Sequence, residues 1–147
     1  MTYLPFDPAS FRWQGVSDRA YKNDPGTARG MAWQGISRNT LARGSFEVRY
    51  FEIAPGGFSS LEKHAHEHAV ICVRGRGAAL VGPEVHALRP LDLVRSGPWV
   101  PHRWVNAGDE PFGFLCTVDG ERDAPAPLDD EEWAALRANP LTAPFVH

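Results

Sequence analysis

The chain has 147 residues, enough for one domain with a hydrophobic core, and its 43% apolar and 22% charged residues are ordinary for a globular protein. A net charge of −3 and a pI of about 6.0 exclude the basic surface that nucleic-acid binding requires, so we expect no nucleic-acid partner. No run of about 18 apolar residues suggests a membrane span, and the N-terminal residues lack the basic and apolar regions of an export signal, which predicts a cytoplasmic protein.

Residues 1–40 show weak periodicity and carry scattered aromatic and turn residues. We expect them to form an N-terminal extension of irregular segments and short edge strands that covers a barrel or a dimer interface. From residue 41 to residue 120, short apolar runs alternate with turns such as Pro55-Gly56-Gly57. The predicted strands are 45–53, 63–74, 78–81, 85–88, 91–94, 99–105 and 112–118. Short strands at this spacing predict a single all-β sandwich or barrel.

Residues 121–147 begin as a polar, proline-rich linker and then predict one short helix over residues 128–137. Acidic residues crowd the first turn of this helix and Arg137 lies in its last turn, as the helix dipole favours. Trp133 and Leu136 are three positions apart, so they share the helix face that we expect to dock on the barrel.

Three histidines at a spacing of two are the strongest functional signal in the chain. Because side chains alternate along a strand, His64, His66 and His68 would share one face of the predicted strand 63–74. Buried imidazoles need a polar partner, and one bound metal ion would supply it for all three. The alternative is a solvent-exposed histidine cluster on an edge strand. His102, on the predicted strand 99–105, is a fourth candidate ligand if the two strands are neighbours.

Three further residues are candidates for lining a pocket beside these histidines. Cys72 lies four positions after His68 and would share its face, where it either lines the pocket or fills the core. Trp104 lies two positions after His102 and is expected to point inward, and Tyr50 is a candidate for the pocket mouth. We interpret Cys72 and Cys116 as reduced core thiols, since both lie in apolar strand-like runs.

The chain resembles the cupins, a family defined by two histidine-containing motifs. His64-x-His66 matches the histidine pair of the first motif, and His68, six residues before Gly75, stands in place of its glutamate. His102-x3-Asn106 matches the end of the second motif, and Asp92 resembles the aspartate after its opening glycine. The gap between His66 and the third ligand is one residue where the family has three or four. The resemblance covers residues 41–120.

This resemblance implies the cupin double-stranded β-helix, a jelly-roll barrel, with a four-histidine metal site and a homodimeric assembly. Imidazole ligands suit a divalent transition metal ion, and Fe, Mn, Ni, Cu and Zn all remain candidates. Positions left open on the ion would take a small oxygen-bearing ligand or substrate. One hypothesis is therefore a mononuclear metal-dependent enzyme, a dioxygenase or an isomerase-type cupin. The alternative is a non-catalytic module that binds a small ligand or is stabilised by the metal. No general acid or base is evident beside the histidines in the sequence.

Overall fold

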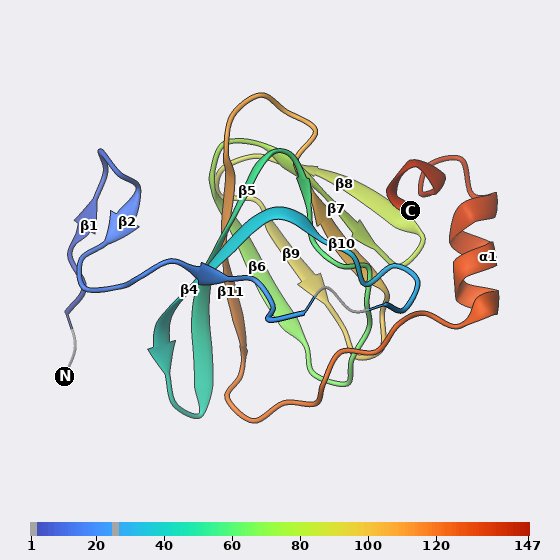
Figure 1. Ribbon diagram of the computed structural model, residues 1–147, viewed down its shortest axis with the longest axis horizontal. Coiled ribbons are helices and arrows are strands. Elements are labelled where there is room, and N and C mark those ends of the chain that lie inside the picture. Colours follow the sequence, from blue (N-terminus) through green and yellow to red (C-terminus); the bar gives the residue numbers. More distant parts are fainter. Residues whose placement is uncertain (1–2, 25–26) are drawn as a thin grey trace.

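The computed structural model describes residues 3–24 and 27–147, and within these ranges a nine-stranded antiparallel sheet curls into a half-barrel (Figure 1). The strands are β1 (Phe6–Asp7), β2 (Arg12–Trp13), β3 (Arg19–Ala20), β4 (Gln34–Arg43), β5 (Phe46–Phe58), β6 (His68–Arg74), β7 (Gly77–Val81), β8 (Glu84–Leu88), β9 (Leu93–Ser96), β10 (His102–Val105) and β11 (Phe112–Asp119). Helix α1 (Asp130–Ala138) and a 3-10 helix, η1 (Ala143–Phe145), follow. The predicted all-β barrel with a short C-terminal helix is confirmed.

Strand β5 lies at the centre of the sheet and positions the interior. It pairs with β4, β10 and β11, while β6 pairs with β11 on the far side. Its residues 55–57 do not form the turn that we predicted. Gly56 has a φ of 74°, and a Cβ on Gly57 would lie 2.7 Å from the carbonyl oxygen of Gln34. The two glycines therefore let β5 bend against β4 and continue to Phe58.

Two other segments differ from the expectation. Strand β4 has ten residues, in a region where only irregular segments and short strands were expected, because its polar side chains hide the alternation. Strand β6 begins at His68, so that His64 and His66 precede it in a loop. The backbone N–H groups of Ala65 and His66 donate to the Asp123 carboxylate at 2.7 and 3.1 Å, which replaces the strand partner that the prediction assumed.

The C-terminal helix docks on the barrel as predicted. Asp129 caps it, accepting from the N–H of Glu132, whose side chain accepts in turn from the N–H of Asp129. Trp133 and Leu136 are buried in a hydrophobic cluster that includes Leu61 of the barrel. Within the described residues, no helix is long and apolar enough to cross a membrane.

The N-terminal hairpin of β1 and β2 covers the outer face of the central strand. The ring of Trp13 lies 5.2 Å from that of Tyr50, and the ring of Phe11 lies 5.8 Å from it. Tyr50 is fully buried between this hairpin and Gly113, where a Cβ would lie 2.2 Å from its hydroxyl oxygen. Arg12 ties the hairpin down through two hydrogen bonds of 3.1 Å to the Glu52 carboxylate. The hairpin therefore covers one face of β5, and the opposite face, with Arg49 and Phe51, lines the interior.

Candidate metal centre and cavity

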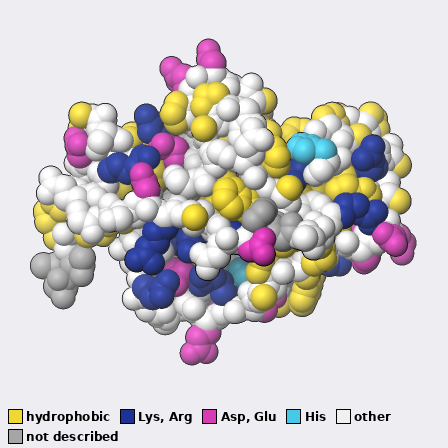
Figure 2. Space-filling view, in the orientation of Figure 1, with side chains coloured by type: hydrophobic (Ala, Val, Ile, Leu, Met, Phe, Trp, Pro, Cys, Tyr) yellow, Lys and Arg dark blue, Asp and Glu magenta, His cyan; other side chains and the backbone are white. Residues whose placement is uncertain are grey.

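A cavity of about 350 Å³ opens inside the half-barrel. On the face of the molecule drawn in Figure 2, a recess contains a histidine side chain, and Lys and Arg side chains lie beside it. All four predicted ligands line the cavity, and so does Trp104. Cys72 and Tyr50 do not line it, which corrects the pocket prediction for both. Cys72 packs in the hydrophobic core, and Tyr50 lies on the outer face of β5 beneath the N-terminal hairpin.

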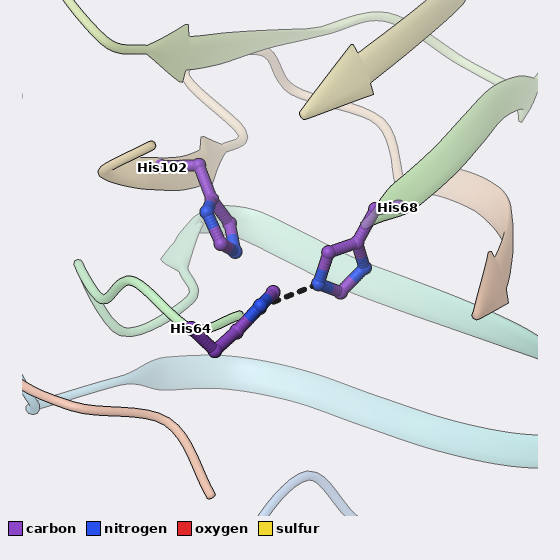
Figure 3. A group of neighbouring side chains, drawn as sticks. All are labelled: His64, His68 and His102. Carbon is purple, nitrogen blue, oxygen red and sulfur yellow. Dashed lines mark hydrogen bonds between the residues drawn. The ribbon is translucent and has the colours of Figure 1, made fainter. Parts of the chain in front are cut away.

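Three imidazoles from two separate segments meet in this cavity. His64 lies in the loop before β6, His68 is the first residue of β6, and His102 is the first residue of β10 (Figure 3). The centroid of the His102 ring lies 4.8 Å from that of His64 and 5.0 Å from that of His68. One ring nitrogen from each residue lies within 4.8 Å of the others, and all three side chains are buried. The predicted convergence of His102 on the first histidine motif is therefore present.

Backbone carbonyls fix the protonation of two of these rings. Nδ1 of His64 lies 2.8 Å from the carbonyl oxygen of His66, and Nδ1 of His102 lies 2.9 Å from that of Val100. Because a carbonyl can only accept, each Nδ1 carries the proton and each Nε2 presents a lone pair. Nε2 of His64 lies 2.6 Å from Nε2 of His68. The buried lone pairs face the shared centre of the cluster, as ligands of a metal ion must.

Burial keeps the three rings neutral. Loss of hydration, reinforced by repulsion from the neighbouring His102 and His66, lowers the pKa of His64 to about 4. Burial is also the main cause that lowers the pKa of His68 and that of His102. Neutral imidazole is the form that binds a metal, so the three residues fit a divalent transition metal ion.

His66 is held differently from the other three. Its ring stacks on that of His64, with centroids 3.5 Å apart and an interplanar angle of 4°, and its Nδ1 lies 2.7 Å from the Asp123 carboxylate. His64, His66 and Asp123 form a second group of closely spaced ligand atoms. Donation from the N–H groups of Ala65 and from His66 lowers the pKa of Asp123. Asp123 was not predicted, because it lies in the polar linker, where no pattern marks it.

A second cavity residue that was not predicted as one is Cys116, on β11. Cys116 lines the cavity, and its sulfur lies 3.0 Å from Nδ1 of His68 and 3.5 Å from Nη2 of Arg49. Burial raises the pKa of this thiol, and the positive charge of Arg49 opposes that rise. The sequence predicted a reduced core thiol, because Cys116 lies in an apolar strand-like run, and Cys116 is indeed free and buried in the core cluster. Only the pairing of β11 with β6 brings it beside His68.

An acidic group also lies beside the histidines, contrary to the sequence-based expectation. Glu62 lines the cavity and is almost fully buried. Its carboxylate accepts hydrogen bonds from Ser60 and from the Lys22 ammonium. The Tyr21 hydroxyl lies 3.0 Å from the Ser60 oxygen, and burial raises the pKa of Tyr21. This network places a buried acidic group in the wall of the cavity.

A curled antiparallel barrel with buried histidines inside it is the architecture of the cupins, and residues 49–118 match the family model of the cupin domain. The chain belongs to this family. It is 42% identical to the 1-methylthio-D-xylulose 5-phosphate methylsulfurylase of Rhodospirillum rubrum, with 97% of this chain and 92% of the relative covered.

Two solved structures support the same assignment. A cupin-2 domain from Rhodospirillum rubrum is 40% identical with a TM-score of 0.82, covering 92% of this chain and 90% of the other. A cupin 2 conserved barrel domain protein from Rhodopseudomonas palustris is 34% identical with a TM-score of 0.86, covering 99% of both chains.

Proposed function

We propose that this cupin is a metal-dependent enzyme that removes the methylthio group from a phosphorylated 1-methylthio-ketose. One observation carries the proposal: a thiol, Cys116, lines the cavity with its sulfur 3.0 Å from Nδ1 of His68. A thiol is the group needed to accept sulfur from a substrate. The similarity over 97% of the chain to a relative named as a methylsulfurylase supports this choice. We prefer it to the dioxygenase or isomerase reaction expected from the resemblance, because neither of those reactions calls for the thiol that lies beside His68.

The metal would be held by His64, His68 and His102, with His66 as the predicted fourth ligand. When bound, a divalent transition metal ion would polarise the carbonyl oxygen of the ketose. With Nε2 of His68 used as a ligand, the remaining ring proton sits on Nδ1. The imidazole then donates to the Cys116 sulfur, which favours the thiolate and fixes its position.

The reaction balances around the substrate sulfur. The Cys116 thiolate attacks the methylthio sulfur, an S–S bond forms and the bond between that sulfur and C1 of the ketose breaks. The electron pair of the broken bond is delocalised over C1 and the adjacent carbonyl oxygen. C1 then takes up a proton from water, which balances the proton that Cys116 released to water on forming the thiolate, and this leaves a 1-deoxyketose phosphate and a methyl disulfide on Cys116. A low-molecular-weight thiol resolves this disulfide by exchange and restores the free cysteine.

The experiment is a turnover assay with metal-loaded protein, 1-methylthio-D-xylulose 5-phosphate and a small thiol, followed by NMR. We expect the S-methyl signal to be replaced by that of a methyl disulfide while a C-methyl signal of the deoxyketose phosphate appears. Cys116→Ala is expected to abolish the conversion, and Cys72→Ala, a buried cysteine outside the cavity, is expected to retain it. Unchanged substrate with the wild-type protein, or full activity in Cys116→Ala, would overturn the proposal.

A further inference from the structure

Three arginines from different segments line the same cavity. Arg38 lies on β4, Arg49 on β5, and Arg122 three residues beyond the end of β11. Both β4 and β11 pair with β5, and their register sets Thr40 and Cys116 opposite Arg49. The sheet therefore brings positive charge from three segments to one wall, where Lys and Arg side chains are seen beside the recess (Figure 2).

Two of these guanidinium groups, those of Arg38 and Arg49, form no ion pair among the described residues. Arg49 is only 7% exposed, and its Nη2 donates to the Cys116 sulfur, while its Nε has no hydrogen-bond partner among the described residues. Nε of Arg38 is also buried without a partner. Within residues 3–24 and 27–147, no carboxylate forms an ion pair with Arg38 or Arg49. A buried cation without a partner is costly, so these donors are suited to an anionic ligand.

The nearby carboxylates are already engaged. Glu47 pairs with Arg122 at 2.9 Å and with Arg43 at 2.9 Å, and Asp123 is bound to His66 and two backbone N–H groups. Burial, followed by repulsion from Arg49 and Arg122, lowers the pKa of Arg38, and the attraction of the Glu47 carboxylate offsets this only in part. That repulsion would be relieved by a ligand carrying two negative charges.

We infer that Arg38, Arg49 and Arg122 form the subsite that holds the phosphate group of the substrate. The inference rests on the proposed function and deepens it, since it assigns the charged end of the substrate to particular residues. A phosphate monoester carries about two negative charges near neutral pH, and planar guanidinium groups bind its oxygens with paired hydrogen bonds. The reacting end of the substrate then lies toward the histidines and Cys116, which line the same cavity.

The test is calorimetric binding of two matched probes, D-xylulose 5-phosphate and D-xylulose, to the metal-loaded full-length protein. We expect the phosphorylated sugar to bind roughly 10- to 100-fold more tightly, as charge-assisted hydrogen bonds allow. Arg38→Gln and Arg122→Gln should each lower affinity for D-xylulose 5-phosphate about tenfold and leave affinity for D-xylulose unchanged. Arg95→Gln is the matched control, because Arg95 is exposed and pairs with Glu67.

Two results would overturn the inference: equal binding of both probes by the wild-type protein, or an unchanged preference in both arginine variants. Thermal melting of each variant shows whether it is folded, and Arg38→Lys, which keeps the charge but loses the fork of donors, should show an intermediate preference. Failure of the proposed function would look different. The methylthio substrate would then stay intact while the preference for the phosphorylated probe, and its dependence on Arg38 and Arg122, would persist.

Discussion

The sulfur of Cys116 lies 3.0 Å from Nδ1 of His68, whose Nε2 faces Nε2 of His64 at 2.6 Å. One imidazole thus connects the thiol to the cluster of candidate metal ligands. A metal ion or other group bound at Nε2 of His68 leaves the ring proton on Nδ1, so that Nδ1 donates a hydrogen bond to the Cys116 sulfur. The relationship links metal binding to the chemical state of the thiol, and it comes from the pairing of β11 with β6.

A methyl disulfide on Cys116 should accumulate when the resolving thiol is omitted. Incubation with 1-methylthio-D-xylulose 5-phosphate alone is expected to add one methylthio group in place of one proton to the intact protein, and peptide mapping should place it on Cys116. Addition of a small thiol should remove it. In Cys116→Ala no adduct should form, whereas Cys72→Ala should form it normally. A modification on Cys72 would contradict the assignment of Cys116 as the nucleophile.

Metal content should depend on the buried histidines and not on an exposed one. His64→Ala and His102→Ala each remove one of three clustered nitrogens, so we expect bound metal to fall about tenfold or more. His86→Ala is the matched control, since His86 is partly exposed and pairs with Glu84. The measurement is mass spectrometry of metals in protein purified without an affinity tag. Unchanged metal in both cavity variants would remove the metal site.

The predicted role of His66 as a fourth ligand has its own test. Its Nδ1 is taken by Asp123, and its ring stacks on that of His64. If its remaining nitrogen binds the ion, His66→Ala should lower the metal content of the protein below that of the wild type. Asp123→Asn keeps the His66 ring and the size of side chain 123 but removes the carboxylate that orients the ring. Comparing the two variants therefore separates the loss of the imidazole from the loss of its orientation. Equal metal in the wild type and in His66→Ala would exclude His66 from the ligand set.

The strand pattern was predictable where turns and alternation are clear. The hairpin of β7 and β8 and the helix face of Trp133 and Leu136 follow directly from Gly and Pro positions and from helical spacing. Strand β4 was missed, because residues such as Arg38 and Asn39 point toward a polar cavity or a neighbouring carboxylate rather than an apolar core. A polar cavity removes the hydrophobic signal by which strands are recognised.

The histidine cluster was predicted from the sequence, but the backbone conformation that brings its residues together differs from the predicted one. Strand alternation was expected to align the three histidines, whereas a loop held by Asp123 brings His64 back onto His68. Cys116 and Arg49 were not recognised, since their position depends on which strands pair, and one sequence does not specify that pairing. The available signal was the run of charged residues at inward positions of β5, Glu47 and Arg49, which a fully apolar barrel would not tolerate.

Glu52 should make the stability of the fold depend on pH. Burial alone would raise the pKa of this carboxyl, but hydrogen bonds from Arg12, Tyr50 and Arg74 outweigh it and lower the pKa below its ordinary value of 4.5. A group whose pKa is lower in the folded state stabilises that state above its unfolded-state pKa and loses the effect as the pH falls through the folded-state value. Glu52→Gln should therefore lower the free energy of unfolding near neutral pH by about 1–2 kcal/mol.

The difference between the wild type and Glu52→Gln should shrink as the pH falls below 4.5, and urea unfolding at several pH values measures it. Glu84→Gln is the control, since Glu84 is exposed and pairs with His86. A difference that stays constant into the acid range would show that Glu52 acts through packing and not through its charge.

Arg103 should be the main polar contribution to holding the C-terminal segment on the barrel. Its side chain is fully buried and donates to the carbonyl oxygens of Ser59 at 2.9 Å, Phe145 at 2.9 Å and Gly30 at 3.2 Å. Burial lowers its pKa to about 10, so it stays charged at neutral pH. Arg103→Met fills much of the same space but leaves these carbonyls without donors, and we expect a loss of about 3–5 kcal/mol in the free energy of unfolding.

The matched control is Arg137→Met, at an exposed position in the last turn of α1, which should change stability by less than about 0.5 kcal/mol. Limited proteolysis adds a local readout, because the segment after residue 138 should be cleaved faster in Arg103→Met than in the control. Equal stability of the two variants would mean that apolar contacts hold the C-terminal segment, namely those of Leu136 and Val146 in the cluster with Leu61. The hydrogen bonds of Arg103 would then be no more favourable than those that its guanidinium group makes with water in the unfolded chain.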